Sequence, residues 1–233
     1  MTVFTTDVVG YMSSNDFSAI ETLAKQVPVD GLMVEVGSLM GRSTTCWATF
    51  CDPTVQIIAI DEFPEEVMMY VDEKTKEQKL LWSFDPDYDS IKNNVKPQVD
   101  RPHDNIPLLN KPYRIHDEFK KNTAQFTNVR HIKGKSPDNI NYTGEKIDLF
   151  FLDAAHKNPS DWDNIKFFAK YMNVGGIICG HDWFPEDTYP DVNKNIKDLE
   201  RIYETTAVKF EGTNVWSIQV TKHYDEVSNL FGN

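Results

Sequence analysis

Five short apolar runs constrain the fold of this chain more than any other feature of its sequence. They are "GLMVEVG" (31–37), "VQIIAID" (55–61), "NVRHIKG" (128–134), "IDLFFLD" (147–153) and "GGIICGHD" (175–182). Each run is apolar at nearly every position rather than at alternate positions, which is typical of strands covered on both faces in a parallel sheet. Stretches with helical periodicity lie between them, at 42–50, 114–126 and 160–172. This alternation predicts a doubly wound α/β fold.

The C-terminal part of the chain predicts how the sheet ends. A helical pattern at 190–204 precedes two strand-like runs, 207–212 and 215–220, which are separated by Thr213 and Asn214. We expect a tight hairpin here, which completes a mostly parallel seven-stranded sheet with an antiparallel edge. The length suits one α/β domain, so residues 1–233 are predicted to form a single domain with an N-terminal helical segment at 1–28.

Residues 61–112 break the alternation of strand and helix. This stretch holds six of the chain's 12 prolines, no glycine and several scattered aromatic residues, where a short connection would suffice. Long connections inside compact domains are uncommon, and many of them are lids or binding loops. We predict a lid or substrate-binding insertion; a partly helical surface insertion is the alternative.

The composition limits the classes of partner. The formal net charge is -12, whereas nucleic-acid binding needs clustered Lys and Arg, so we expect no nucleic-acid partner. No apolar stretch approaches the roughly 18 residues that span a bilayer, and the N-terminus lacks the pattern of a secretory signal. The three cysteines lack metal-site spacing, which favours free thiols in a reducing cytoplasm. We therefore expect a cytoplasmic protein with a small-molecule substrate and no membrane partner; homo-oligomerisation stays open.

The first apolar run leads directly into "EVGSLMGRST", which indicates a ligand site. Gly37 and Gly41 lie between a predicted strand and a predicted helix, where glycine lets a ligand approach the backbone and the helix amides point at it. Glu35 is an acid near the end of the first strand, and Asp61 ends the second. A carboxylate at the position of Asp61 commonly accepts both hydroxyl groups of an adenosine ribose.

The same loop distinguishes between two nucleotide cofactors. A dinucleotide-binding loop needs glycine where Leu39 stands, because the diphosphate must approach the backbone closely. The acid Glu35 would repel a diphosphate but suits a cationic aminoacyl sulfonium. S-adenosylmethionine therefore fits this loop better than NAD.

Five motifs together resemble a known family. The stretches "VEVGSLMGRST", "IIAIDEF", "HIKGKSPD", "IDLFFLDAAH" and "GGIICGHDW" resemble, in this order, class I S-adenosylmethionine-dependent methyltransferases, with a Rossmann-like fold, in the branch with catechol-type and macrolide-sugar O-methyltransferases. The resemblance implies that Asp61 holds the cofactor's ribose and that Ser136 lies near the adenine. It implies a lining for the methionine end formed by Glu35, Gly37, Ser38, Gly41 and Ser43.

Polar side chains at two strand ends predict a catalytic and metal site. Asp153 ends the fourth run, and His181 and Asp182 end the fifth; the carboxyl ends of parallel strands meet at one edge of the sheet. Oxygen ligands suit Mg²⁺, and imidazole is tolerated by softer divalent cations. In the family resembled, a carboxylate and a polar pair at these places hold the metal. Asp153 and Asp182 match this pattern and His181 departs from it, so we predict Mg²⁺ or another divalent cation at these three residues.

His156 is the predicted catalytic base, acting together with Asp153. The acceptor hydroxyl must lose its proton to attack a sulfonium methyl group, and an imidazole can accept that proton near neutral pH. The D-x-x-H spacing also resembles the sugar O-methyltransferases, in which this histidine is the base. We therefore predict a metal-assisted O-methyltransferase acting on a small hydroxylated metabolite or sugar.

Several alternatives remain open from the sequence. The enzyme can lack a metal and use His156 as its sole base, with Asp153 contacting only the cofactor's amino group. An iron-dependent oxygenase would instead use His156, His181 and one aspartate as iron ligands. A cofactor-binding module without catalysis is a further alternative.

Overall fold

The structure is a computed structural model of the chain, and it describes residues 7–71, 78–94, 111–185 and 188–232. Its main feature is a seven-stranded sheet with the strand order β6-β2-β1-β7-β8-β10-β9. The bounds of these strands are β1 Leu32–Val36, β2 Gln56–Asp61, β6 Val129–Lys133, β7 Ile147–Leu152, β8 Met172–Gly180, β9 Val208–Lys209 and β10 Trp216–Gln219. The strands β6, β2, β1, β7 and β8 pair in parallel, and β10 and β9 pair antiparallel. The predicted doubly wound, mostly parallel sheet with an antiparallel edge is confirmed.

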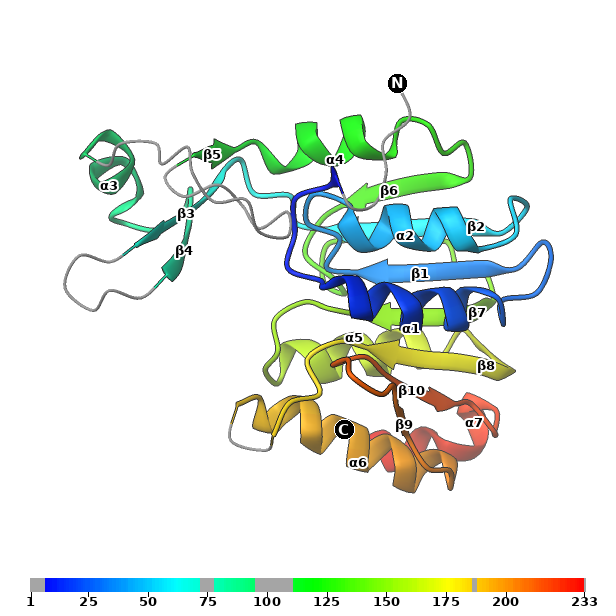
Figure 1. The fold of residues 1–233 in the computed structure, drawn as a ribbon. Helices are drawn as coiled ribbons and strands as arrows, with labels where there is room; N and C mark the ends of the chain where they lie inside the picture. The colour runs from blue at the N-terminus through cyan, green and yellow to red at the C-terminus, as the bar shows by residue number, and fades with distance from the viewer. Residues whose placement is uncertain (1–6, 72–77, 95–110, 186–187, 233) are drawn as a thin grey trace.

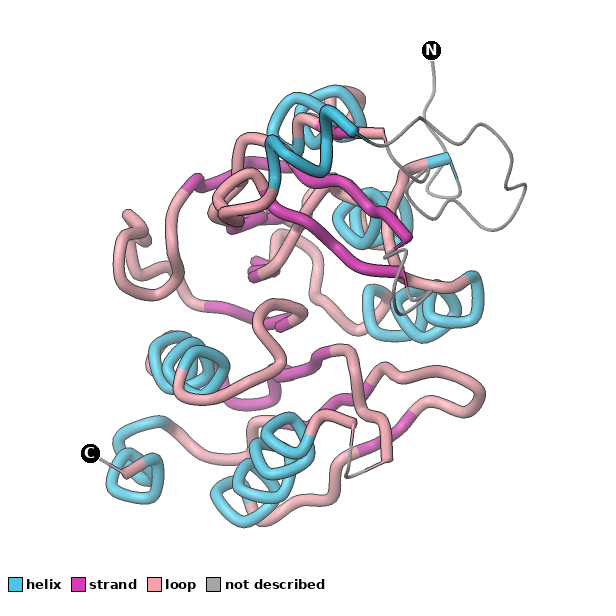
Figure 2. The backbone as a smooth tube through the Cα atoms, turned by 90° about the vertical axis from the view of Figure 1, so that its left-hand side faces the viewer, coloured by secondary structure: helices cyan, strands magenta, loops and turns pink. Residues whose placement is uncertain are grey.

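Helices cover both faces of the sheet (Figures 1 and 2). Alternate strand residues point to opposite faces, so Met33 of β1 packs in one core cluster with Trp47, and Val34 packs in another with Phe168. The first face carries α1 Ser14–Ala24 and α2 Arg42–Phe50, with α4 Ile115–Thr123 beside α2; the second carries α5 Ser160–Ala169 and α6 Pro190–Tyr203. A short helix, α7 Tyr224–Val227, and a 3₁₀ turn follow β10. Burial of both faces explains why the strands are continuously apolar in sequence.

The edge hairpin differs from the prediction in its turn. β9 and β10 are paired through Trp216 with Lys209, so residues 210–215 form the connection rather than a two-residue turn at Thr213 and Asn214. The amide of Phe210 donates to the carbonyl of Val215 at 3.2 Å and closes this wider loop.

The insertion after β2 contains a small sheet that the sequence did not predict. Its strands, β3 Val67–Val71, β4 Gln78–Trp82 and β5 Pro112–Tyr113, have the order β4-β3-β5 and are all antiparallel. The helix α3 Tyr88–Asn94 packs on it through Tyr88, Met68 and Leu81. Parts of the predicted segments, at 1–6, 72–77 and 95–110, lie outside the described residues.

The insertion projects from the side of the main sheet at which β1 ends (Figure 1). Its Trp82 packs against a cluster that includes Met40 and Phe63, which lie in the connections that follow β1 and β2. The insertion therefore contacts the main domain beside the carboxyl ends of the strands. No helix within the described ranges is long and apolar enough to span a bilayer.

Candidate active site

The direction of the strand order changes between β1 and β7, where sheets of this kind have their ligand-binding crevice. The chain moves from β1 to β2 in one direction and from β7 to β8 in the other, and ligands of such sheets bind where the direction changes. At this point Gly37 has a φ of 94°, and a Cβ atom there would lie 1.8 Å from the carbonyl oxygen of Asp153. Only glycine fits, and it brings the ends of β1 and β7 into direct contact.

The loop from β1 to α2 holds a buried acid with an unused oxygen. Glu35 is fully buried, and its Oε2 accepts a hydrogen bond from the hydroxyl of Thr44 in α2. Its Oε1 and the hydroxyl of Ser38 are buried and have no hydrogen-bond partner among the described residues. Burial raises the pKa of Glu35 to about 7, although the neighbouring hydroxyl groups of Ser43, Thr44 and Ser38 lower it in part. Buried polar atoms normally have partners, so these two atoms fit a ligand that supplies a donor, as the ammonium group of S-adenosylmethionine does.

Gly41 and Ser43, which were also predicted to line the cofactor, lie at the start of α2. Gly41 has a φ of 88° and is the N-cap of α2, whose first turn contains the buried Ser43. The first amides of α2 therefore face the same loop that contains Gly37.

Asp61 lies at the end of β2 with its carboxylate held from two sides. Its Oδ2 accepts from the amide of Leu39 at 2.8 Å, and its Oδ1 accepts from the amide of Phe63 at 2.7 Å. Burial raises the pKa of this carboxyl group. Each oxygen keeps a further lone pair for a ligand hydroxyl. The predicted contact with a ribose remains a prediction, and the geometry places the acid beside the loop that it would serve.

Ser136 follows β6, and its hydroxyl is already engaged. It donates to Oδ1 of Asn164 in α5 at 2.5 Å, and Nδ2 of Asn164 donates back to the carbonyl of Ser136 at 3.2 Å. This pair fixes the loop after β6 to α5. A contact of Ser136 with adenine remains a prediction.

The structure brings the four predicted catalytic and metal residues together at the ends of β7 and β8. Nε2 of His156 lies 3.2 Å from Oδ1 of Asp153 and 2.8 Å from Oδ2 of Asp182. Nδ1 of His181 lies 3.2 Å from Oδ1 of Asp182. His156 and Asp182 have positive φ values of 56° and 64°, which cost roughly 1–3 kcal/mol per residue and are concentrated at functional sites.

The acids and imidazoles of this cluster shift one another's pKa. Burial lowers the pKa of His156, but the contacts with Asp153 and Asp182 outweigh it and raise that pKa to about 10. Burial likewise opposes the charged form of His181, yet contacts with Asp16 and Asp182 raise its pKa to about 11. The contacts with the acids therefore favour the protonated form of both rings.

Three of these residues also form a candidate donor set for a cation. Asp153, His181 and Asp182 each offer one ligand atom, and these atoms lie within 4.8 Å of one another. Opposite ligands of one divalent ion are about 4–5 Å apart, so the set fits such an ion. The carboxylates that would hold the ion are those that His156 contacts, and the ring and an ion therefore compete for them.

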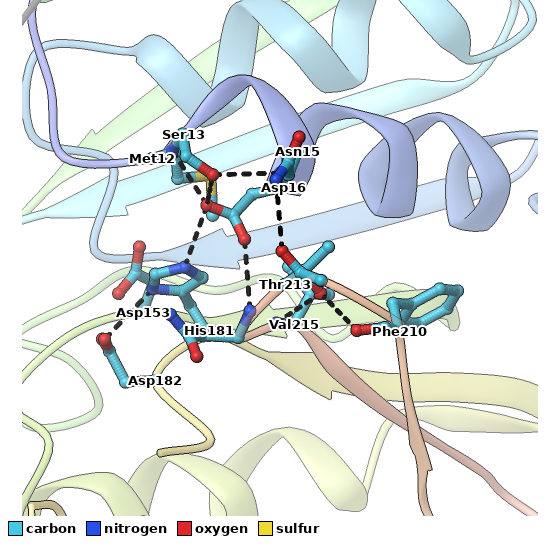
Figure 3. Close-up of polar contacts among 12 residues, drawn as sticks. Met12, Ser13, Asn15, Asp16, Asp153, His181, Asp182, Phe210, Thr213 and Val215 are labelled. Atoms are coloured by element: carbon cyan, nitrogen blue, oxygen red, sulfur yellow. Dashed lines mark hydrogen bonds and ion pairs between the residues drawn. The ribbon is translucent and has the colours of Figure 1, made fainter. Parts of the chain in front are cut away.

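Two buried acids at the site were not predicted from the sequence. Asp161 in α5 accepts from the amide of Ala155 at 3.2 Å and so holds the loop that carries His156; burial raises its pKa to about 6. Asp16 in α1 lies with its Oδ2 3.5 Å from Nε2 of His181 (Figure 3). The only sequence signal for Asp16 is the capping-box pattern that it forms with Ser13.

Comparisons with known proteins agree with this geometry. A family model described as a methyltransferase domain matches residues 34–183. "Uncharacterized protein R132" of Acanthamoeba polyphaga mimivirus is 32% identical over 98 residues, which cover 36% of this chain and only 44% of that protein.

Solved structures show the same fold at low sequence identity. The O-methyltransferase NovP has a TM-score of 0.54 at 14% identity, over 89% of this chain and 80% of that chain. A SAM-dependent O-methyltransferase from Thermotoga maritima has a TM-score of 0.56 at 10% identity, over 93% and 68%. The calicheamicin methyltransferase CalS11 has a TM-score of 0.53 at 13% identity, over 88% and 78%.

The family match covers more than half of the chain, so the chain belongs to this methyltransferase family. Together with the Rossmann-like sheet, it makes the protein a class I S-adenosylmethionine-dependent methyltransferase, as the sequence predicted. The family membership favours methyl transfer over the iron-dependent oxygenase and over a binding module without catalysis.

Proposed function

We propose that this enzyme transfers a methyl group to a hydroxyl oxygen of a small metabolite or sugar. The observation that carries the proposal is that Asp153 and Asp182 both contact Nε2 of His156, at 3.2 and 2.8 Å, directly beside the Gly37 loop. An acid–imidazole group at the cofactor's reactive end suits an acceptor that must lose a proton. The names of NovP and of the Thermotoga maritima protein, both O-methyltransferases, support the same reaction.

The proposed reaction assigns distinct tasks to the two ends of the crevice. The acceptor oxygen forms a bond to the methyl carbon while the bond from that carbon to sulfur breaks, leaving a neutral thioether. The hydroxyl proton passes to the pair formed by His156 and Asp153, whose Nε2 and Oδ1 lie 3.2 Å apart. His156 and Asp153 therefore position the attacking hydroxyl oxygen as well as accept its proton.

A divalent cation is the second part of the proposal, with Asp153, His181 and Asp182 as its ligands. Such a cation would supply Lewis-acid stabilisation to the developing alkoxide. Asp153 and Asp182 would then be shared between the cation and the ring of His156, which both acids contact. The metal-free alternative uses His156 as the sole base and requires that its ring first lose the proton that Asp153 and Asp182 stabilise by raising its pKa to about 10.

The experiment is a methyl-transfer assay with labelled S-adenosylmethionine and a panel of hydroxylated acceptors that includes glycosylated aromatic compounds. We expect transfer to oxygen, loss of activity with a chelator and recovery with Mn²⁺ or Mg²⁺. Full activity in the chelator would favour the metal-free alternative, and binding of NAD in place of S-adenosylmethionine would contradict the proposal. The small-molecule partner, the cytoplasmic location and the role of 61–112 in acceptor binding rest on the sequence and stay predictions.

A further inference from the structure

The acid–imidazole cluster continues beyond the residues that the reaction uses. Acids and imidazoles alternate from Asp153 through His156, Asp182 and His181 to Asp16, with neighbouring atoms 2.8 to 3.5 Å apart. The last member comes from α1, which lies before the residues 34–183 of the family match.

Asp16 is a buried carboxylate that ties three segments together. Its side chain is almost fully buried, with the residue 3% exposed. Its Oδ2 accepts from the amide and the hydroxyl of Ser13 at 2.8 and 2.7 Å, and its Oδ1 accepts from the amide of Asn214 in the β9–β10 loop at 3.3 Å. Nε2 of His181 lies at an ion-pair distance of 3.5 Å from Oδ2, on the side of the ring opposite to Asp182, and is buried with no hydrogen bond among the described residues (Figure 3).

The two nitrogens of His181 therefore face different acids. Nε2 faces Asp16, whereas Nδ1 faces Asp182, which belongs to the donor set for a cation. A metal-binding histidine usually donates its other ring N–H to a carboxylate or carbonyl, which fixes the tautomer and raises the basicity of the ligating nitrogen. Asp16 has the position and the charge for that task.

We propose that Asp16 is a positioning residue of the cation site, and that it accepts the Nε2–H of His181 so that the Nδ1 lone pair points at the cation held by Asp153 and Asp182. This inference rests on the proposed function, because it needs a cation at that site. It also narrows the class of cation. One imidazole and two carboxylates suit a borderline transition metal such as Mn²⁺, Co²⁺ or Zn²⁺ better than Mg²⁺, which prefers oxygen ligands throughout.

A purely structural role for Asp16 makes a different prediction. Asp16 is the third helical residue of α1 and forms a capping box with Ser13, which by itself accounts for a buried acid at this position. In that case only the stability of α1 depends on Asp16, and any variant that damages the cap has the same effect. Ser13→Ala damages the cap but leaves the carboxylate facing His181, so it is the matched control.

The test is a titration with Co²⁺, followed by its visible absorption and by calorimetry, in the full chain without cofactor. We expect Asp16→Asn to weaken Co²⁺ binding roughly tenfold or more and to change the absorption spectrum, because the ligand loses its charged partner. We expect Ser13→Ala to bind Co²⁺ within twofold of the wild type although both variants unfold at lower temperature. His181→Ala should lose more affinity than Asp16→Asn.

The outcomes separate this inference from the proposed function. Equal affinities in the wild type and Asp16→Asn would overturn the role of Asp16 and leave the metal site intact. Equal affinities in the wild type and His181→Ala would remove His181 as a ligand, and with it the inference. Failure of the wild-type protein to bind Co²⁺, Mn²⁺ or Mg²⁺ would instead contradict the metal-assisted part of the proposed function.

A second measurement needs no variant, and so does not depend on whether Asp16→Asn folds. Long-range ¹⁵N NMR of the wild-type protein with Zn²⁺ reports the state of each imidazole nitrogen. We expect His181 to have a metal-bound Nδ1 and a protonated Nε2. Binding of Zn²⁺ through Nε2 would overturn the proposal.

Discussion

The two halves of the crevice are built in opposite ways. At the cofactor end, one continuous stretch from Glu35 to Thr44 supplies the loop, and Oε1 of Glu35 and the hydroxyl of Ser38 are left without partners among the described residues. At the catalytic end, the acids and imidazoles come from α1 and the ends of β7 and β8, and they form ion-pair contacts with one another, although Nε2 of His181 makes no hydrogen bond among the described residues.

The difference shows how each end meets its ligand. Unpaired buried atoms gain partners when a ligand arrives, so the cofactor end is preorganised and less stable without its ligand. At the catalytic end, an acid or imidazole must give up a contact with its neighbour in the cluster before it can contact a ligand. Substitutions should therefore affect binding and stability at the first end, and turnover at the second.

The largest expected effect tests the catalytic end. His156→Ala should lower kcat about 1000-fold, because removing a general base costs on the order of 10²–10⁴ in rate. Its dissociation constant for S-adenosylhomocysteine, measured by calorimetry, should stay within twofold, because the ring contacts acids rather than the cofactor loop. His223→Ala, an exposed histidine before α7, is the control and should leave kcat unchanged. Unimpaired turnover in His156→Ala would make Asp153 the sole base.

The next largest effect tests how much stability the buried acid Glu35 costs at the cofactor end. The folded-state pKa of Glu35, about 7, lies above its ordinary value of 4.5, so the folded chain binds this proton more tightly than the unfolded chain. The free energy of unfolding must then fall as the pH rises from about 4.5 to 7, by about 3 kcal/mol in total. Glu35→Gln cannot ionise, and it should remove this loss.

Urea unfolding without cofactor at pH 5 and pH 8 measures the difference. Glu35→Gln should be more stable than the wild type at pH 8, yet bind S-adenosylhomocysteine about tenfold more weakly, since it loses a charge-assisted contact with the ammonium group. Glu21→Gln, on the exposed side of α1, should change neither quantity. Parallel pH profiles for Glu35→Gln and the wild type would show that Glu35 keeps an ordinary pKa.

The two ends also differ in how far they could be predicted from sequence. The strands could be predicted because burial on both faces makes them continuously apolar, and Asp153 and Asp182 followed because parallel strands end at one edge. Asp16 could not be predicted, because its contact with His181 joins residues 165 positions apart (181 minus 16) and depends on how α1 packs on the sheet. The small sheet of β3, β4 and β5 was missed because its strands are short and lie in a proline-rich stretch with no clear alternation.

A smaller effect is expected at the ribose end of the cofactor loop. Asp61→Asn should weaken binding of S-adenosylhomocysteine about 10- to 30-fold, because the charged acceptor for the ribose hydroxyls is lost while one amide–oxygen bond can persist. Asp52→Asn is the matched control, because Asp52 also accepts a backbone amide, that of Thr54, in a turn outside the site. Unchanged affinity in Asp61→Asn would remove the ribose assignment, and calorimetry with NAD would show whether another nucleotide binds instead.

The smallest effect is expected in the insertion, which belongs to neither end. Phe84 is 67% exposed and stacks on Trp82 with ring centroids 6.0 Å apart, so it leaves a large apolar face in water unless an acceptor covers it. An aromatic contact of this kind contributes about 0.5–1.5 kcal/mol, so Phe84→Ala should raise the KM for an aromatic or sugar acceptor roughly threefold. The kcat and the cofactor affinity should not change, because Trp82 still packs against the cluster with Met40 and Phe63.

Val29→Ala removes a side chain of similar exposure just before β1, at the opposite end of the strands, and should leave KM unaltered. If both variants have the same KM as the wild type, the acceptor does not reach this part of the insertion, and its specificity must be set within the crevice between β1 and β7.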